Sequence, residues 1–341
     1  MLTEERSAAL AQARARQTRG DYPGVVLLLG ELDVADLLAE PELGFLLATA
    51  LRRVGEWQRA FELTTALAQP CAHHGRGWLA RRRLNLEAAL HFDRGGIRAA
   101  AERWSELVDT ASRAGDDALL SNACNNLGVA YTLLAKPDEA LASCGRALAV
   151  AQRIGDRRSV AQAQHNLAIA YRELGLLREA GEHFERAADD AALIRSDEIL
   201  GRAETERALV LLETGDLRLA EATAARALAR FRRGGDRLGE GEALRVLGMV
   251  ALARRQAARA RAQLWEALRL ARAAKAPLLE AETLEALAVV GAVPGVWDRA
   301  DASSMRAGAE TIFQAMGAEA WGRQVRARLS ALTGNGDDHA A

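Results

Sequence analysis

Hydrophobic and polar positions recur along most of the chain at a fixed interval. The stretches 122–147 and 162–187 share a pattern in which apolar Leu127, Tyr131 and Leu134 and polar Asn126 and Glu139 each return 40 residues later. An alanine keeps the same phase over six equal steps of 40 residues, at Ala60, Ala100, Ala140, Ala180, Ala220, Ala260 and Ala300. Chance does not hold a residue in phase over this length, so the pattern indicates an array of structural repeats.

Each repeat is predicted to be a pair of helices. Glycines recur at the junctions, where a left-handed conformation ends a helix, and Asp or Ser often follows as the N-cap of the next one. Loops of two to four residues make neighbouring helices antiparallel. The predicted helices of the regular units cover residues 42–54, 57–69, 76–94, 97–113, 117–134, 137–153, 157–174, 177–193, 198–214, 217–232, 237–254, 257–273, 277–290 and 296 onward.

The ends of the chain depart from this phase. Helices at 3–19 and 25–32 predict an N-terminal capping pair within residues 1–40, because terminal repeats of such arrays are atypical. The seven regular units occupy 41–301. Closing helices at 302–316 and 319–332 are expected within residues 302–333, and 334–341 is expected to be a flexible tail. The predicted fold is therefore all-α, a right-handed α-solenoid superhelix of antiparallel helical hairpins.

Composition supports helices and narrows the class of function. Half of the residues are apolar but only 4% are aromatic, as expected when small residues allow helices to approach closely. The formal net charge is −1, which gives no electrostatic case for nucleic-acid binding. No apolar run approaches the ~18 residues of a membrane span, and no signal peptide is recognisable, so no membrane association and a cytoplasmic location are expected.

Motifs for catalysis are missing from the sequence. It contains no P-loop, no G-x-S-x-G, no HExxH and no dinucleotide-binding fingerprint, so we predict that the protein is not an enzyme and needs no cofactor. Cys71, His73 and His74 are the one cluster of metal-capable side chains, and without a fourth ligand at a usual spacing we predict no metal site. Cys124 and Cys144 are expected to be buried thiols.

The repeat pattern resembles the tetratricopeptide repeat, with a longer period than the usual ~34 residues. The resemblance is carried by Cys124, Leu127, Gly128, Tyr131, Ala140, Cys144 and Ala147, and by the matching residues of the next unit. Long-period arrays of this kind are similar to those of kinesin light chains and of the sensor regions of bacterial signal-transduction regulators. The resemblance implies a superhelix whose first helix in each pair, here called helix A, lines a concave groove. The second helix of each pair is called helix B.

Carrying the ligand-contacting positions of that family onto this sequence predicts a partner-binding groove. The predicted residues are Arg82, Asn85, Asn122, Asn125, Asn126, Gln162, His165, Asn166, Arg172, Arg202, Glu206 and Arg245. An amide side chain can both donate to and accept from a peptide backbone, and arginines can hold acidic groups. For Asn126 and Asn166 two alternatives stay open, which are contact with a ligand and hydrogen bonding that only braces neighbouring helices.

The predicted function is a non-enzymatic scaffold that binds a protein or peptide segment in the groove, in bacterial signalling or assembly. The alternative is a sensor module that binds a small ligand or signal peptide and acts through a separate regulator. Self-association through the closing helices also stays open, because an exposed patch of their apolar residues would mark a dimer surface and a buried one would cap the last repeat. These residues are Trp297, Ile312, Phe313, Met316 and Trp321.

Four polar residues occupy positions of the repeat that are apolar elsewhere. They are Glu87, His91, Glu204 and Arg207. An unpaired buried charge costs several kcal/mol, so we predict that these residues form ion pairs between helices or with residues three or four positions away.

Overall fold

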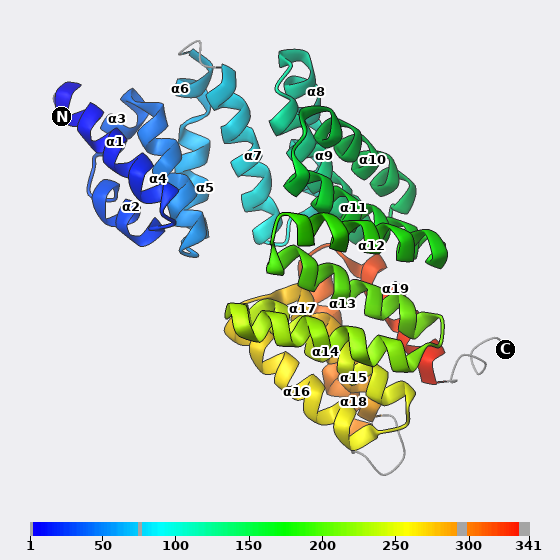
Figure 1. Ribbon diagram of the computed structural model, residues 1–341. Coiled ribbons are helices and arrows are strands. Elements are labelled where there is room, and N and C mark those ends of the chain that lie inside the picture. Colours follow the sequence, from blue (N-terminus) through cyan, green and yellow to red (C-terminus); the bar gives the residue numbers. More distant parts are fainter. Residues whose placement is uncertain (1–2, 74–76, 292–298, 334–341) are drawn as a thin grey trace. The chain divides into compact units, whose positions relative to one another are not determined.

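The computed structural model describes residues 3–73, 77–291 and 299–333 of the chain. Within these ranges every regular element is a helix (Figure 1). The helices are α1 (Thr3–Thr18), α2 (Tyr22–Leu29), α3 (Val34–Ala39), α4 (Pro41–Arg53), α5 (Trp57–Ala66), α6 (Ala68–His73), α7 (Gly77–Asp93), α8 (Ile97–Ala114), α9 (Asp117–Leu133), α10 (Pro137–Ile154), α11 (Arg157–Glu173), α12 (Leu177–Leu193), α13 (Asp197–Glu213), α14 (Leu217–Gly234), α15 (Arg237–Ala253), α16 (Ala257–Ala273), α17 (Pro277–Gly291), α18 (Arg299–Ala315) and α19 (Glu319–Thr333).

The chain divides into two compact units, residues 1–123 and residues 124–341. In the first unit, α1 and α2 pack against each other and against α4, and the pairs α4–α5 and α7–α8 form hairpins. Leu43, Leu47 and Leu51 of α4 are at the centre of an apolar core that also takes in Val25 and Leu29 of α2. The sequence pattern missed α3 and α6, since both are short and lie outside the repeat phase.

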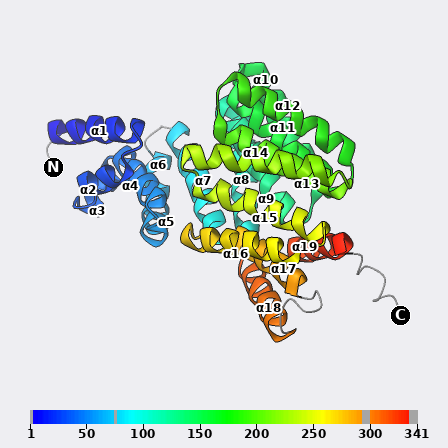
Figure 2. The same ribbon diagram turned by 60° about the horizontal axis from the view of Figure 1, so that its bottom comes forward.

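In the second unit the helices pack as consecutive hairpins, α11–α12, α13–α14, α15–α16 and α17–α18. Each A helix also contacts the A helix of the next hairpin, so α11, α13, α15 and α17 form a continuous row (Figures 1 and 2). The main contacts of each B helix, α12, α14 and α16, are with its neighbours in sequence. The A helices therefore pack more closely than the B helices and form the inner side of the array. The predicted α-solenoid of antiparallel hairpins is confirmed.

The 40-residue period is visible in both packing and turns. The phased alanines are each 0% exposed from Ala60 to Ala260, because a larger side chain at this position would push the two helices of a hairpin apart. Gly115 and Gly155 end their helices with φ of 65° and 69°. Ala135 and Arg255 take the same left-handed conformation, with φ of 55° and 60°, where the period requires the turn and no glycine is present.

Three of the four unexpected polar residues form ion pairs as predicted. Arg83 pairs with Glu87 at 2.6 Å, four residues away on the same helix. Between helices, Glu204 accepts from Arg226 and Arg230 of α14, at 3.1 Å and 3.0 Å, and Arg207 pairs with Glu185. His91 differs, because its ring packs edge-on against Phe61 with a centroid distance of 5.1 Å.

The last two helices differ in how they pack. α18 forms a hairpin with α17, whereas α19 lies against α17 and also contacts α15 (Figure 2). Phe313, Met316 and Trp321 are buried, with exposed fractions of 2%, 6% and 5%, so they do not form an exposed apolar patch. Trp297 lies outside the described residues.

Two further features bear on the predicted environment of the chain. Among the helices the structure describes, none is long and apolar enough to cross a lipid bilayer.

Cys71, Cys124 and Cys144 are free and buried. Burial raises the pKa of the Cys144 thiol to about 12, so that this thiol stays protonated at neutral pH.

Candidate binding groove

Three of the predicted groove residues belong to the first unit. The guanidinium of Arg82 lies 5.4 Å from the ring centre of Trp78. The side-chain oxygen of Asn85 accepts a hydrogen bond from Nε1 of Trp104 at 3.0 Å, and Asn122 is exposed. Asn85 therefore ties α7 to α8, while Arg82 and Asn122 remain open to solvent.

Two of the predicted asparagines bond to each other. Nδ2 of Asn166, on α11, donates to Oδ1 of Asn125, on α9, at 2.9 Å. The bond joins two A helices, so Asn166 does brace its neighbours, and a ligand contact by this residue stays a prediction. Asn126 is half-buried, as is Gln162, which lies one turn before Asn166 on α11.

The remaining predicted residues come together on three successive A helices. His165 and Arg172 lie on α11, Arg202 and Glu206 on α13, and Arg245 on α15. They are near enough that the charges of Arg172 and Arg202 act on His165 and the charge of Arg245 acts on Glu206. Five of the positions carried over from the tetratricopeptide resemblance therefore lie together on the inner side of the second unit, and a partner contact by them stays a prediction.

His165 is an uncharged member of this group. Burial lowers the pKa of its imidazole to about 4, so the ring is neutral at physiological pH. Its ring packs against Phe184 in a T-shaped arrangement with centroids 5.5 Å apart, and Nδ1 is buried without a hydrogen-bond partner in the described part of the chain. A neutral imidazole with a free nitrogen can donate to or accept from an incoming polar group.

Glu242, also on α15, faces the same region. Burial raises the pKa of its carboxyl to about 7, although the positive charge of Arg202 acts in the opposite direction. Near neutral pH the carboxyl is therefore divided between its protonated and ionised forms. A positively charged ligand group beside it would favour the ionised form.

Replacing Glu242 with glutamine should stabilise the protein in a pH-dependent way. Between the ordinary pKa of 4.5 and the raised value of about 7, the folded state keeps a proton that the unfolded state has lost, so stability is lost as pH rises through this window. Gln does not ionise and avoids this loss. We expect Glu242→Gln to raise the free energy of unfolding by about 2–3 kcal/mol at pH 8 and by much less at pH 5.

The measurement is urea denaturation at the two pH values. Glu139→Gln, at a side chain that is 50% exposed on α10, serves as the control and should change the free energy of unfolding by less than about 0.5 kcal/mol at both. An equal effect of Glu242→Gln at pH 5 and pH 8 would show that the carboxyl is not held protonated by burial.

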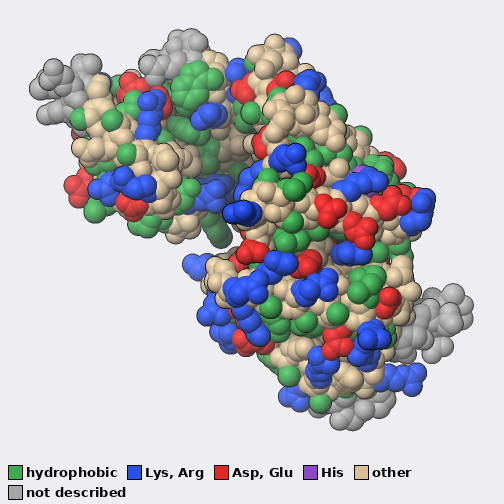
Figure 3. Space-filling view, viewed as in Figure 1, with side chains coloured by type: hydrophobic (Ala, Val, Ile, Leu, Met, Phe, Trp, Pro, Cys, Tyr) green, Lys and Arg blue, Asp and Glu red, His purple; other side chains and the backbone are tan. Residues whose placement is uncertain are grey.

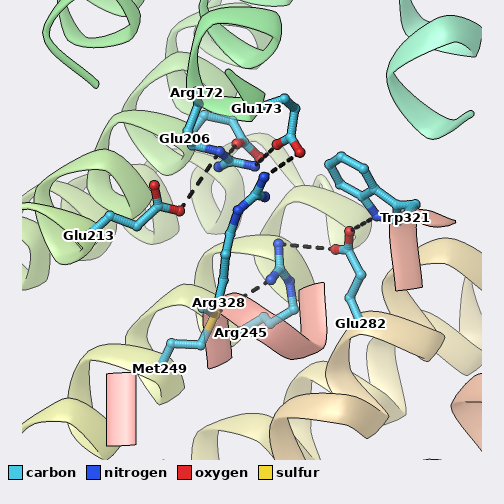
Figure 4. Close-up of polar contacts among 9 residues, drawn as sticks. All are labelled: Arg172, Glu173, Glu206, Glu213, Arg245, Met249, Glu282, Trp321 and Arg328. Carbon is cyan, nitrogen blue, oxygen red and sulfur yellow. Dashed lines mark hydrogen bonds and ion pairs between the residues drawn. The ribbon is translucent and has the colours of Figure 1, made fainter. Parts of the chain in front are cut away.

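A cluster of buried charges lies near the C-terminal ends of α11 and α13, as Figure 4 shows. Nη1 of Arg172 donates to Glu206 at 2.6 Å, and its other nitrogens lie 3.4 Å from Glu173 and 4.0 Å from Glu213. The side chains of Arg172 and Glu173 are only 5% and 2% exposed. Burial alone would lower the pKa of Arg172, but the surrounding carboxylates raise it, so the guanidinium keeps its charge.

The C-terminal helix contributes directly to this cluster. Arg328 of α19 pairs with Glu173 of α11, which lies 155 residues earlier in the chain (Figure 4). Nε1 of Trp321 donates to Glu282 of α17 at 2.9 Å, and the same carboxylate pairs with Arg245 at 3.1 Å. α19 is therefore joined by polar contacts to the inner side of the array.

A small cavity remains between α19 and the A helices. Its volume is about 40 Å³, and its lining combines the charged groups with Leu209, Met249, Val325 and Leu329. This volume has room for a few water molecules and is far below the ~300–1,000 Å³ of a typical small-molecule site. α19 thus fills the part of the groove that it covers.

Several of these residues were missed from the sequence, although the period carried a signal for some of them. Glu213 follows Glu173 by 40 residues and Glu282 follows Glu242 by 40, so extending the groove positions along each A helix would have found them. Arg328 and Trp321 had no such signal. Their place depends on how α19 folds back, which no local pattern encodes.

The face of the molecule seen in Figure 3 carries both acidic and basic side chains. Within the described ranges, no group of three or more His, Cys, Asp or Glu side chains is arranged to hold a metal ion. The inner side of the A helices is therefore the main candidate for a functional surface.

Comparison with known proteins supports this view of the fold. Residues 119–191 match the family described as Tetratricopeptide repeat. The chain thus contains tetratricopeptide repeats within an α-solenoid, which confirms the resemblance seen in its sequence. No curated protein sequence is significantly similar to the chain.

Similar solved structures are also helical-repeat proteins. A Rap protein complexed with Competence and Sporulation Factor superposes with a TM-score of 0.66 at 11% identity, over 98% of this chain and 100% of that one. Aspartyl phosphate phosphatase F from Bacillus subtilis gives 0.60 at 12% identity, over 98% and 91%. The tetratricopeptide repeat sensor protein PH0952 from Pyrococcus horikoshii, a signal-transduction ATPase with numerous domains, gives 0.59 at 15%, over 91% and 46%. At these identities the likeness concerns the fold.

Proposed function

We propose that this protein is a non-enzymatic scaffold that binds a protein or peptide segment along the inner side of its second unit, in bacterial signalling or assembly. The observation that carries the proposal is the row of His165, Arg202 and Glu242 on three successive A helices. These side chains are only partly exposed, and both Nδ1 of His165 and Nε of Arg202 are buried without a hydrogen-bond partner among the described residues. Unsatisfied polar atoms on a partly open surface favour a partner that satisfies them.

The spacing of this row suits an extended or helical segment. The three A helices are adjacent, so a partner crossing them would meet one polar group per repeat, as in other helical-repeat binding surfaces. The superposition on a Rap protein complexed with Competence and Sporulation Factor, over nearly the full length of both chains, is consistent with a solenoid that binds a partner. The small-ligand alternative is less favoured, because the cavity beside the groove is only about 40 Å³.

Affinity co-purification from the lysate of the source cell tests the proposal. The groove variant His165→Ala, Arg202→Ala removes two polar groups of the row. The matched control Arg178→Ala alters a side chain that is 78% exposed on the B helix α12. We expect wild type and control to retrieve the same protein, and the groove variant to retrieve at least about tenfold less, a ratio that corresponds to 1.4 kcal/mol of binding free energy.

Circular dichroism first establishes that all three proteins are folded. If the folded groove variant retrieves the same protein in the same amount as wild type, the binding surface lies elsewhere on the molecule and the proposal is wrong.

A further inference from the structure

We infer that the groove accepts a basic amphipathic helix as its partner, and that α19 is a built-in copy of such a helix that occupies the groove until the partner displaces it. This inference rests on the proposed function and adds to it the chemical class of the partner and a means of regulation. It follows from the way in which α19 is seated on the inner side of the second unit.

The apolar side of α19 is buried in the array. Trp321, Val325 and Leu329 follow one another at intervals of four residues and are 5%, 9% and 1% exposed. Side chains at this interval lie on one face of a helix, and here that face meets Leu209 and Met249 of the A helices α13 and α15. The opposite face carries Arg323, which is exposed. α19 is thus an amphipathic helix lying in a groove, which is a common mode of peptide recognition.

Basic side chains of α19 meet buried acids of the groove. Nη2 of Arg326 donates to Glu285 of α17 at 2.6 Å, and Arg328 pairs with Glu173. The side chains of Glu285 and Glu173 are 0% and 2% exposed, whereas those of Arg326 and Arg328 are 32% and 25% exposed. These acids lie beneath α19, which supplies cations to them in addition to Arg306 of α18, 3.7 Å from Glu285, and Arg172 of α11, 3.4 Å from Glu173.

The groove itself has too few cations for its acids. Among the described residues of the A helices, Arg172 alone lies at ion-pair distance from Glu173, Glu206 and Glu213. Covering these carboxylates without bringing a cation would be costly, so an occupant that replaces α19 should bring a guanidinium or ammonium group. Charge complementarity of this kind determines which partner is accepted.

The groove also has donors that α19 leaves unused. Nε of Arg172 and Nε of Arg245 are buried without a hydrogen-bond partner in the described part of the chain, and both residues line the cavity under α19. Arg172 and Arg245 are 6% and 8% exposed. An occupant that satisfied these donors as well as the acids would bind better than α19 does, which gives a true partner the means to displace it.

Displacement of α19 requires a change only at the turn that connects it to α18. α18 and α19 are joined at Gly317, which has a φ of 62°. Helix α19 can leave the groove by a change of backbone conformation at this turn, while the hairpins α11–α12 to α17–α18 keep their packing. The full chain therefore binds a partner more weakly than an uncovered groove would. Its affinity equals that of the uncovered groove multiplied by the fraction of molecules in which α19 is displaced.

Binding of a peptide copy of α19 to the full chain tests this inference. The probe is a fluorescein-labelled peptide of residues 319–333, followed by fluorescence anisotropy. In the full chain, Arg328→Glu and the milder Arg328→Gln weaken the packing of α19 against the A helices, because they remove the ion pair with Glu173. Arg323→Glu is the matched control on the exposed side of the same helix. We expect both Arg328 variants to bind the peptide at least about tenfold more tightly than wild type or the control does.

The same experiment has a specificity arm. A peptide that carries Arg328→Glu should bind the Arg328→Gln chain at least about tenfold more weakly than the unchanged peptide, because it places a carboxylate against Glu173. No binding of the unchanged peptide to either folded Arg328 variant overturns the inference. Equal binding to all four chains, wild type included, also overturns it, because the peptide would then bind a surface that α19 does not cover.

These outcomes are separable from those of the co-purification. If the peptide does not bind but the His165→Ala, Arg202→Ala variant loses its partner, the scaffold proposal stands and α19 is a structural cap. If the peptide binds the Arg328 variants but the groove variant keeps its partner, α19 occupies a displaceable site as inferred and the scaffold proposal fails.

Discussion

Replacing Arg172 with methionine should lower the free energy of unfolding by about 3–5 kcal/mol, the range observed when one partner of a buried ion pair is removed. Arg172 is 6% exposed and lies within ion-pair distance of Glu206, Glu173 and Glu213, of which Glu173 also pairs with Arg328. Methionine fills a similar volume, so the loss would come from uncompensated carboxylates rather than from a cavity.

The pH dependence of this loss identifies its cause. Burial acts to raise the pKa of Glu206, but the charges of Arg172, His165 and Arg245 and the hydrogen bond from Arg172 together hold it below the ordinary value of 4.5, with Arg172 contributing most. Without Arg172, burial would raise the pKa of Glu206, and the variant would regain stability as pH falls and the carboxyl takes up a proton. The deficit relative to wild type should therefore be larger at pH 8 than at pH 5.

Urea denaturation at both pH values is the measurement. Arg186→Met is the control, because that side chain is 53% exposed and its pair with Glu182 should contribute less than about 1 kcal/mol. A deficit for Arg172→Met that is the same at pH 5 and pH 8 would mean that lost packing, not charge, accounts for it.

Replacing Phe231 with alanine should have an effect of similar size, about 3–5 kcal/mol, for a different reason. Phe231 lies on α14 and is 2% exposed. Its ring is enclosed by two glycines, since a Cβ atom on Gly239 would lie 2.4 Å from the ring and one on Gly201 would lie 2.7 Å from it. α13 and α15 therefore approach so closely around the ring that its removal leaves a cavity that they cannot easily fill.

Glycine substitutions test the same packing in the opposite direction. Gly239→Ala should destabilise the wild type, although alanine favours a helix by up to ~1 kcal/mol, because the new methyl group collides with Phe231. In the Phe231→Ala background the collision is gone, so we expect a coupling energy of at least about 1 kcal/mol. Gly145, in the interior of α10, has no atom within 4 Å of its Cβ position, and Gly145→Ala should be neutral or stabilising. Strict additivity of Gly239→Ala and Phe231→Ala would contradict this account.

The parts of the fold that were predictable from the sequence depend on local rules. The phased alanines and the turns at Gly115 and Gly155 recur because each repeat meets the same neighbour in the same way, so one hairpin is informative about the next. Carrying the ligand positions of the tetratricopeptide resemblance along this period placed His165, Arg202 and Glu206 on one surface. It also predicted that Glu204 would be paired.

The parts that were not predictable depend on contacts that are distant in sequence. The pattern predicted a helix at 319–332 that would either cap the last repeat or expose a dimer surface, but it gave no reason to place Arg328 against Glu173 on a helix four repeats earlier. Likewise, Asn166 could be assigned to a helix face, but its bond to Asn125 could not be told from a ligand-binding role until the spacing of α9 and α11 was known. Periodicity defines faces, whereas tertiary structure decides what covers them.

The central claim is that α19 is seated on the inner side of the array through Arg328. Hydrogen exchange of the backbone amides of residues 319–333, measured by mass spectrometry, tests it most directly. Wild type and Arg323→Glu should protect these amides as strongly as those of α17, and Arg328→Glu should increase their exchange at least about tenfold while α17 stays protected. Amides of α19 that exchange freely in wild type, or that are unaffected by Arg328→Glu, would contradict the account.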